Sequence, residues 1–150
     1  MPLTEKEKEI SGIYEATGYK KDELFNAINV WLAENYNSSK DVIQYSNLKQ
    51  GVLIGKGNIA YPCDGFSCVA KHDWKIHYTA KIDVKDEKFR LTFDNLQLSW
   101  PASHSGGVTS SAYKGPLTKK DDYDLLRPVL LKQGESIKAS LHSSVSSDNW

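Results

Sequence analysis

The sequence predicts an α+β domain in which two helices pack on one face of a curved antiparallel sheet of about five strands. Two observations lead to this fold class. Two separate segments place apolar residues at helical spacing, and four segments between them alternate or concentrate apolar residues as strands do. The expected order is therefore strand, helix, four strands, helix. Since 150 residues usually build one core, residues 1–150 are taken as a single domain.

The first two elements are a strand at residues 9–16, closed by Gly18, and a helix at residues 20–36. The acidic pair Asp22 and Glu23 lies in the first turn of that helix, where the helix dipole favours negative charge. Polar residues occupy the opposite side from an apolar face, so the helix is amphipathic. The apolar face consists of Leu24, Phe25, Ile28, Trp31, Leu32 and Tyr36.

Four strands follow, at residues 42–45, 52–61, 74–85 and 89–100. The third has a strict period of two over its length, which indicates one dry face and one wet face. In the fourth, the apolar register jumps by three residues at Asp94 and Asn95, which predicts a β-bulge that bends the sheet. Gly55 and Gly57 interrupt an apolar strand, so close packing explains them better than a phosphate loop.

The last part of the chain combines a loop and a helix. Residues 102–117 are rich in Ser and Gly without periodicity and predict a surface loop. A helix at about 118–142 follows, with Pro128 either in its first turn or at a kink, and Gly134 allowing a close approach to its support. Residues 143–150 are expected to fray. The expected core pairs sheet residues Trp74, Ile76, Tyr78, Phe89, Leu91 and Phe93 with helix residues Leu24, Ile28, Trp31, Leu126, Leu130 and Ile137.

The charge balance disfavours nucleic acid as a partner. Nineteen basic and nineteen acidic residues cancel, so no broad field gathers phosphate backbones. Only Arg90 and Arg127 are arginines, and Arg is the residue that binds phosphate or guanine through two parallel hydrogen bonds. The sequence also lacks a run of eighteen apolar residues, so we expect a membrane only through a lipid anchor outside these residues.

Cys63 and Cys68 lie in a turn-rich segment and are the only two cysteines. Pro62 and the Asp64–Gly65 pair allow the segment to fold back, so a disulfide is favoured over two free thiols or half of a metal site. A disulfide indicates an oxidising compartment. The polar N-terminus has no secretory signal, so the export signal would lie outside these residues, and a cytoplasmic protein is the alternative.

No catalytic set is expected. The four histidines do not combine with a Ser, Cys or Thr in any known nucleophile pattern, and neither a metal site nor a cofactor is predicted. One candidate binding site remains, a cationic strip on the wet face of strand 74–85 formed by Lys75, His77, Thr79 and Lys81. This strip suits an anionic group or an acidic loop of a partner. A solvated sheet face is the simpler interpretation.

Several segments resemble a bacterial family, the domain-of-unknown-function family numbered forty-four sixty-eight, which has a TATA-binding-protein-like (TBP-like) fold. They are residues 18–25 (GYKKDELF), 31–36 (WLAENY), 38–43 (SSKDVI), 54–57 (IGKG), 78–83 and 88–92. The resemblance covers about residues 10–100 and implies the same order of strands and helix. Many members resemble exported proteins or lipoproteins, but the family supplies no catalytic residues. Members often have a Ser where Lys20 stands, so Asp22 or water is expected to cap the helix here.

These observations favour a non-enzymatic binding or interaction module of the cell envelope, of lipoprotein type, with an unknown protein or small molecule as its partner. Two alternatives remain. One is a carrier of a small apolar ligand in a cavity between the C-terminal helix and the sheet, lined by aromatic residues. The other, less favoured, is a hydrolase that uses His77.

Overall fold

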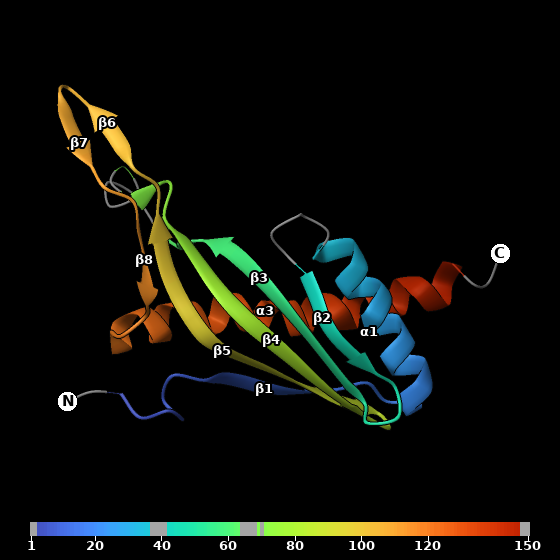
Figure 1. Cartoon of the computed structure of the whole chain (residues 1–150). Coiled ribbons are helices and arrows are strands. Elements are labelled where there is room, and N and C mark those ends of the chain that lie inside the picture. The colour runs from blue at the N-terminus through green and yellow to red at the C-terminus, as the bar shows by residue number, and fades with distance from the viewer. Residues whose placement is uncertain (1–2, 37–41, 64–68, 70, 148–150) are drawn as a thin grey trace.

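The computed structural model describes residues 3–36, 42–63, 69 and 71–147, and Figure 1 shows its arrangement. The helices and strands occur in the following order: β1 (Ile10–Glu15), α1 (Lys21–Asn35), β2 (Val42–Asn47), β3 (Val52–Ala60), β4 (Lys75–Lys85), β5 (Lys88–Trp100), β6 (Ser103–Ser105), β7 (Val108–Ser110), β8 (Tyr113–Pro116) and α3 (Lys120–Ser147). The predicted strand, helix, four strands and final helix are all present.

The main sheet is antiparallel and has the strand order β1-β5-β4-β3-β2. β1 pairs with residues 88–93 of β5, and β8 pairs with residues 97–100 of β5 on the same edge. The long strands β3, β4 and β5 cross the molecule side by side, and both helices lie on the same side of them (Figure 1). The α+β fold class with two helices on one face is confirmed.

The core lies between the helices and the even-numbered residues of β4. Ile76, Tyr78, Ala80, Ile82 and Val84 are buried, whereas the residues between them are exposed or half-buried. This alternation confirms the wet and dry faces that the period of two predicts. All the helix residues expected in the core are buried, including the α3 stripe of Leu126, Leu130, Gly134, Ile137 and Leu141.

Helix α3 approaches β1 closely because of Gly134. A Cβ atom at this position would collide with the ring of Tyr14. That ring stacks on Phe89, with 5.2 Å between ring centroids, and its hydroxyl donates a 2.6 Å hydrogen bond to the carbonyl of Leu131. Gly134 therefore lets α3 pack directly on an aromatic ring of the sheet, as the sequence predicts.

The predicted β-bulge is present in β5. The register with β4 shifts between the pairs His77–Gln97 and Thr79–Asp94, so β5 advances by three residues where β4 advances by two. Asn95 has a φ of 52°, in the left-handed region that Asn tolerates better than most residues.

The expectation for the chain between β5 and α3 is wrong. The segment predicted to be a surface loop contains β6 and β7, which form a short hairpin, and β8, which joins the main sheet. The hairpin projects from the body of the molecule (Figure 1). Its strands have no apolar alternation, because most of their side chains are exposed and pack against little. Sequence periodicity therefore carries no signal here.

Helix α3 also differs from the expectation. It continues to Ser147 rather than ending near residue 142. Of the two expectations for Pro128, the first turn is wrong, because the residue lies inside the helix. Trp74 is half-buried and lies outside the core, where it packs against Tyr61 and Trp100. In the part of the chain that the structure describes, no helix is long and apolar enough to cross a membrane.

The N-terminus of α1 is stabilised by residues other than those expected. The Lys21 backbone N–H donates to the carboxylate of Asp86 at 2.7 Å, and the Lys20 N–H donates to Glu23 at 3.3 Å. Asp86 lies in the turn between β4 and β5, far from the helix in sequence. Asp86 therefore takes a capping role that the sequence assigned to Asp22 or water.

Candidate functional site

The predicted cationic strip lies on the face of the sheet opposite the helices. Lys75 and Lys81 are exposed, while His77 and Thr79 are half-buried. The Nε2 atom of His77 lies 2.7 Å from the Ser99 hydroxyl on β5. The ammonium group of Lys81 pairs with Asp83, at 3.8 Å, and the binding role of the four residues together stays a prediction.

His77 and Thr79 line a small hollow on this face, with a volume of about 140 Å³, which we call the open-face hollow. Its cations come from β3 and β8 and not from β4. The lining residues are Lys56, Gly57, His77, Tyr78, Thr79, Asn95, Gln97 and Lys114.

A second hollow of about 320 Å³, the helix-side hollow, lies between α1, α3 and the end of β3. Among the described residues, β2 pairs with β3 from Val52 to Lys56, and Asn58 and Ile59 near the end of β3 border this hollow. Aromatic rings, amides and hydroxyls line it, with one ammonium group. The lining residues are Trp31, Asn35, Tyr36, Asn58, Ile59, Tyr78, Val129, Lys132, Gln133 and Ser136.

Hydrogen bonds fix the walls of the helix-side hollow. The Tyr36 hydroxyl donates to the Gln133 carbonyl oxygen at 2.7 Å, and the Gln133 amide donates to the Tyr78 hydroxyl at 3.0 Å. Beside this chain, the indole N–H of Trp31 donates to the Ser136 hydroxyl at 3.1 Å. The two helices and β4 are therefore joined by side chains that also face the hollow.

Gly57 allows the two tyrosines to take these positions. A Cβ atom at Gly57 would lie 2.7 Å from the Tyr78 hydroxyl and 3.0 Å from the ring of Tyr36. Both distances are too short for ordinary contact. The structural interpretation of Gly57 is thus supported, since the residue makes room for the rings beside the hollow.

A third hollow, of about 440 Å³, lies where the N-terminal turn meets the bulge and the start of α3. Its wall includes both acidic and basic side chains of the N-terminal segment, among them Glu5, Lys6 and Glu9. Burial, together with the negative charge of Glu9, raises the pKa of Asp94 above its ordinary value, and Lys81 opposes this. The mixed charges of the wall select no ligand class.

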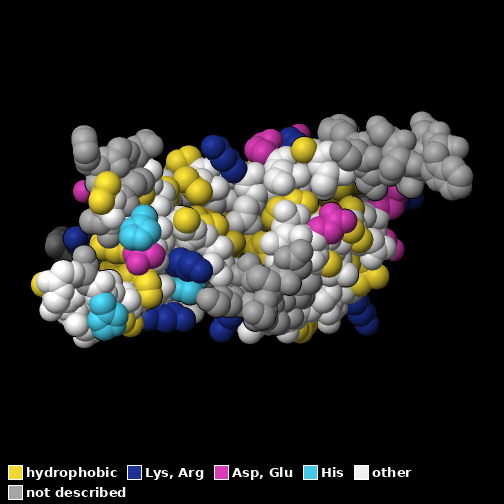
Figure 2. Space-filling model, turned by 90° about the horizontal axis from the view of Figure 1, so that it is seen from above, with side chains coloured by type: hydrophobic (Ala, Val, Ile, Leu, Met, Phe, Trp, Pro, Cys, Tyr) yellow, Lys and Arg dark blue, Asp and Glu magenta, His cyan; other side chains and the backbone are white. Residues whose placement is uncertain are grey.

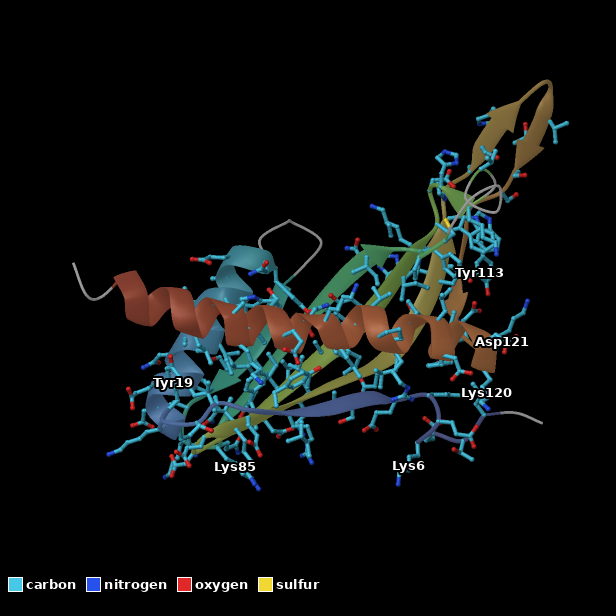
Figure 3. All side chains as sticks on the ribbon, turned by 180° about the vertical axis from the view of Figure 1, so that it is seen from behind. Lys6, Tyr19, Lys85, Tyr113, Lys120 and Asp121 are labelled. Atoms are coloured by element: carbon cyan, nitrogen blue, oxygen red, sulfur yellow. The ribbon has the colours of Figure 1, made fainter. Side chains whose placement is uncertain are left out.

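Four aromatic residues stack in a row at the end of the sheet beneath the hairpin. The ring centroids of Trp74 and Trp100 are 4.8 Å apart, and those of Trp100 and Tyr113 are 4.5 Å apart. Tyr61 meets Trp74 edge-on and donates a 2.7 Å hydrogen bond to Asp122 at the start of α3. Figure 3 shows Tyr113 at the base of the hairpin, close to that end of α3. The row anchors the hairpin to the sheet.

The predicted disulfide is not described by the structure. Cys63 follows β3, whereas Cys68 lies outside the described residues, so the pairing stays a prediction. Among the described residues, no group of three or more His, Cys, Asp or Glu side chains is placed to hold a metal ion. On the face seen in Figure 2, basic and acidic side chains are interspersed, and neither sign forms an extended field.

The comparisons with known proteins identify the family. A model of the domain of unknown function DUF4468, described as having a TBP-like fold, matches residues 11–99, which is more than half of the sequence. The chain belongs to this family. The match lies inside the range of about 10–100 that the sequence resemblance covers. A comparison with curated proteins finds no match.

Two solved structures are similar to this DUF4468 chain. A TBP-like protein from Parabacteroides distasonis aligns with a TM-score of 0.66 at 12% identity, covering 92% of this chain and 95% of that one. A DUF4468 family protein from Bacteroides ovatus aligns with a TM-score of 0.53 at 13% identity over 75% of this chain. The alignment spans 64% of the length of the Bacteroides ovatus protein. At these identities the likeness establishes the fold alone.

Sequence reasoning missed most residues of the helix-side and open-face hollows. In sequence, Lys56 stands out only as the residue between two glycines, and Lys114 falls in the segment predicted to be a loop. Gln133 and Ser136 are polar residues beside the apolar stripe of α3, which in sequence look like solvated helix positions. A helical wheel places them on the border of the stripe, and that is the only signal that they face a neighbouring element.

Proposed function

We propose that this protein is a non-enzymatic binding module of the bacterial cell envelope that holds a small polar molecule in the helix-side hollow. The hydrogen-bonded chain from Tyr36 through Gln133 to Tyr78 supports this function, because it fixes aromatic rings and amide groups around an open volume. A volume of about 320 Å³ lies at the lower end of the range for small-molecule sites.

The lining favours a polar ligand over an apolar one. The hollow lies beside α3 and the sheet, which is where an apolar-ligand carrier would have its cavity. Hydroxyl and amide groups nevertheless form part of its lining, and a ligand with donors and acceptors can hydrogen-bond to them, which an apolar ligand cannot do. A ligand with hydroxyl or amide groups and one flat or apolar face, such as a monosaccharide or an amino acid, matches the mixture of polar groups and the rings of Trp31 and Tyr36.

A thermal-shift screen with monosaccharides, amino acids and nucleosides tests the proposal. A ligand that binds only the folded state raises the melting temperature, and the rise grows with the ligand concentration relative to its dissociation constant. We expect at least one compound to stabilise the wild-type protein and not the Ser136→Phe variant, in which a ring fills the hollow.

Two matched variants control for indirect effects. Ser136→Ala removes the acceptor for Trp31 without filling the hollow, and Ala139→Phe places the same ring at an exposed position of α3 that does not line the hollow. Both are expected to keep most of the ligand-induced shift. The proposal fails if no compound stabilises the wild type, or if Ser136→Phe responds as the wild type does.

The envelope location rests on the predicted disulfide between Cys63 and Cys68, with the cytoplasm as the alternative. In protein isolated from its own host without reductant, alkylation is expected to leave both cysteines unmodified. Labelling of both thiols would remove the support for export. Recovery of a covalently attached lipid in the same sample would show the anchor directly.

A further inference from the structure

We propose a second binding site, separate from the helix-side hollow and on the opposite face of the sheet. The open-face hollow binds a small oxyanion, which is the phosphate or carboxylate group of a ligand or the free ion. Tyr78 lines both hollows, but the cations and donors of this site are other side chains, and the site does not depend on the proposed function.

The β-bulge produces the hollow. His77 pairs in register with Gln97, and Thr79 pairs with Asp94, so Asn95 and Leu96 are accommodated between these two pairs. The extra residue breaks the regular pleat of β5 at the middle of the open face. Asn95, in its left-handed conformation, then lines the hollow next to Gln97 and Thr79. Backbone irregularity of this kind is frequent beside binding sites.

Two lysines lie on opposite sides of the open-face hollow. Lys56 belongs to β3, Lys114 belongs to β8, and β4 and β5 run between them. Three strand spacings place the two strands about 14 Å apart. Lys56 is level with Thr79 and Lys114 is level with Lys75, four residues away along β4, so both side chains must lean toward the middle of the hollow to reach one anion. An anion between them is attracted by both ammonium groups.

The floor of the hollow supplies uncharged donors. The Thr79 hydroxyl and the amide groups of Asn95 and Gln97 can each donate to an oxyanion. His77 is held by its contact with Ser99, which fixes the position of the ring at the edge of the hollow. No carboxylate lines the open-face hollow among the described residues, since Asp94 lines the neighbouring hollow instead.

The size of the open-face hollow limits which ligands can bind there. A volume of about 140 Å³ accommodates a phosphate or carboxylate group but is below the range for whole drug-sized ligands. Lysine binds phosphate as a point charge without the two parallel hydrogen bonds of arginine. We therefore expect weak, salt-dependent binding with little discrimination between tetrahedral and planar oxyanions.

The test uses the full chain labelled with ¹⁵N. Inorganic phosphate is added stepwise at low ionic strength, and an NMR spectrum is recorded after each addition. Citrate and sodium chloride are titrated separately. We expect phosphate or citrate, but not chloride, to shift the side-chain amide signals of Asn95 and Gln97. We expect both oxyanions to bind, and a response to only one of them would assign the site to that group alone. Lys56→Gln and Lys114→Gln are each expected to weaken binding about tenfold.

Lys81→Gln is the matched control. It removes the same charge from the same face of the sheet but does not line the hollow. We expect it to change the affinity by less than about twofold. Equal weakening in all three variants would mean attraction to the general charge of the face and would overturn the site. The absence of any shift at Asn95 and Gln97 with either oxyanion would also overturn it.

Discussion

The two hollows lie on opposite faces of the same three residues of β4, yet they are built by different means. Tyr78 faces the helices, and its neighbours His77 and Thr79 face solvent. The helix-side hollow depends on buried rings, for which Gly57 leaves room and which hydrogen bonds between elements hold in place. The open-face hollow depends on a backbone bulge and on exposed charges. Changes on the helix side should therefore reduce stability, whereas changes on the open face should affect only binding.

The largest effect is expected from Gly134→Ala. The new methyl group would collide with the Tyr14 ring, which Phe89 supports from the other side. We expect a net loss of about 2 kcal/mol in the free energy of unfolding, even though Ala favours the helix by about 1 kcal/mol. Urea unfolding measures the loss. A variant as stable as the wild type would show that α3 does not pack on this ring as described.

Gly57→Ala is expected to have the next largest effect. Its methyl group would push the rings of Tyr36 and Tyr78 out of position, at a cost of about 1–2 kcal/mol. The same shift would distort the helix-side hollow, so a ligand found in the thermal-shift screen should bind more weakly. Loss of stability with unchanged ligand affinity would separate the rings from the site and contradict the proposed function.

Gln133→Leu tests the bridge between the tyrosines. It removes the amide that contacts both hydroxyls, and we expect a loss of about 1 kcal/mol. A double-mutant cycle with Tyr36→Phe should give a coupling energy of about 0.5 kcal/mol or more. Additive effects would show that the contact seen between these side chains contributes nothing to stability.

Asp94→Asn should stabilise the protein in a pH-dependent way. Burial and the charge of Glu9 raise the pKa of Asp94 in the folded state, so ionisation opposes folding. The folded protein holds this proton more tightly than the unfolded chain, and stability at this site falls as pH rises through the raised pKa. At pH 7 the variant should therefore unfold at a higher urea concentration. The gain should shrink below about pH 4, where Asp94 is protonated in both states.

The smallest effects on stability are expected from the open face. Lys56→Gln and Lys114→Gln replace exposed side chains, so each should change the free energy of unfolding by less than about 0.5 kcal/mol. Thermal unfolding at low and high salt measures this. A large loss in either variant would mean that these lysines are structural, and the contrast between the two faces would not hold.

The elements with a periodic pattern could be predicted from the sequence, and the elements without one could not. The α1 face, the alternation in β4 and the Asp94–Asn95 bulge each leave a pattern, because burial on one side selects apolar residues at a fixed interval. The hairpin of β6 and β7 leaves none, since its exposed strands need no apolar alternation. The capping contact from Asp86 to Lys21 joins residues that only the tertiary fold brings together.

For the candidate sites too, neighbours within one strand could be predicted from the sequence, whereas neighbours from different elements could not. His77 and Thr79 could be recognised as neighbours because a strand places alternate residues on one face. Lys56 and Lys114 could not be added to them, because the order of strands in the sheet is not a local property of the sequence. Gln133 joins Tyr36 and Tyr78 only after two helices and a strand have packed.

The most direct test of the proposed function is the NMR spectrum of the tryptophan indole N–H groups during titration with a ligand from the screen. Trp31 lines the helix-side hollow, whereas Trp74 and Trp100 stack at the far end of the sheet. The Trp31→Phe variant assigns the signal of Trp31. We predict that the ligand shifts this signal and leaves those of Trp74 and Trp100 unchanged. A ligand that shifts Trp74 and Trp100 but not Trp31 would contradict the proposal.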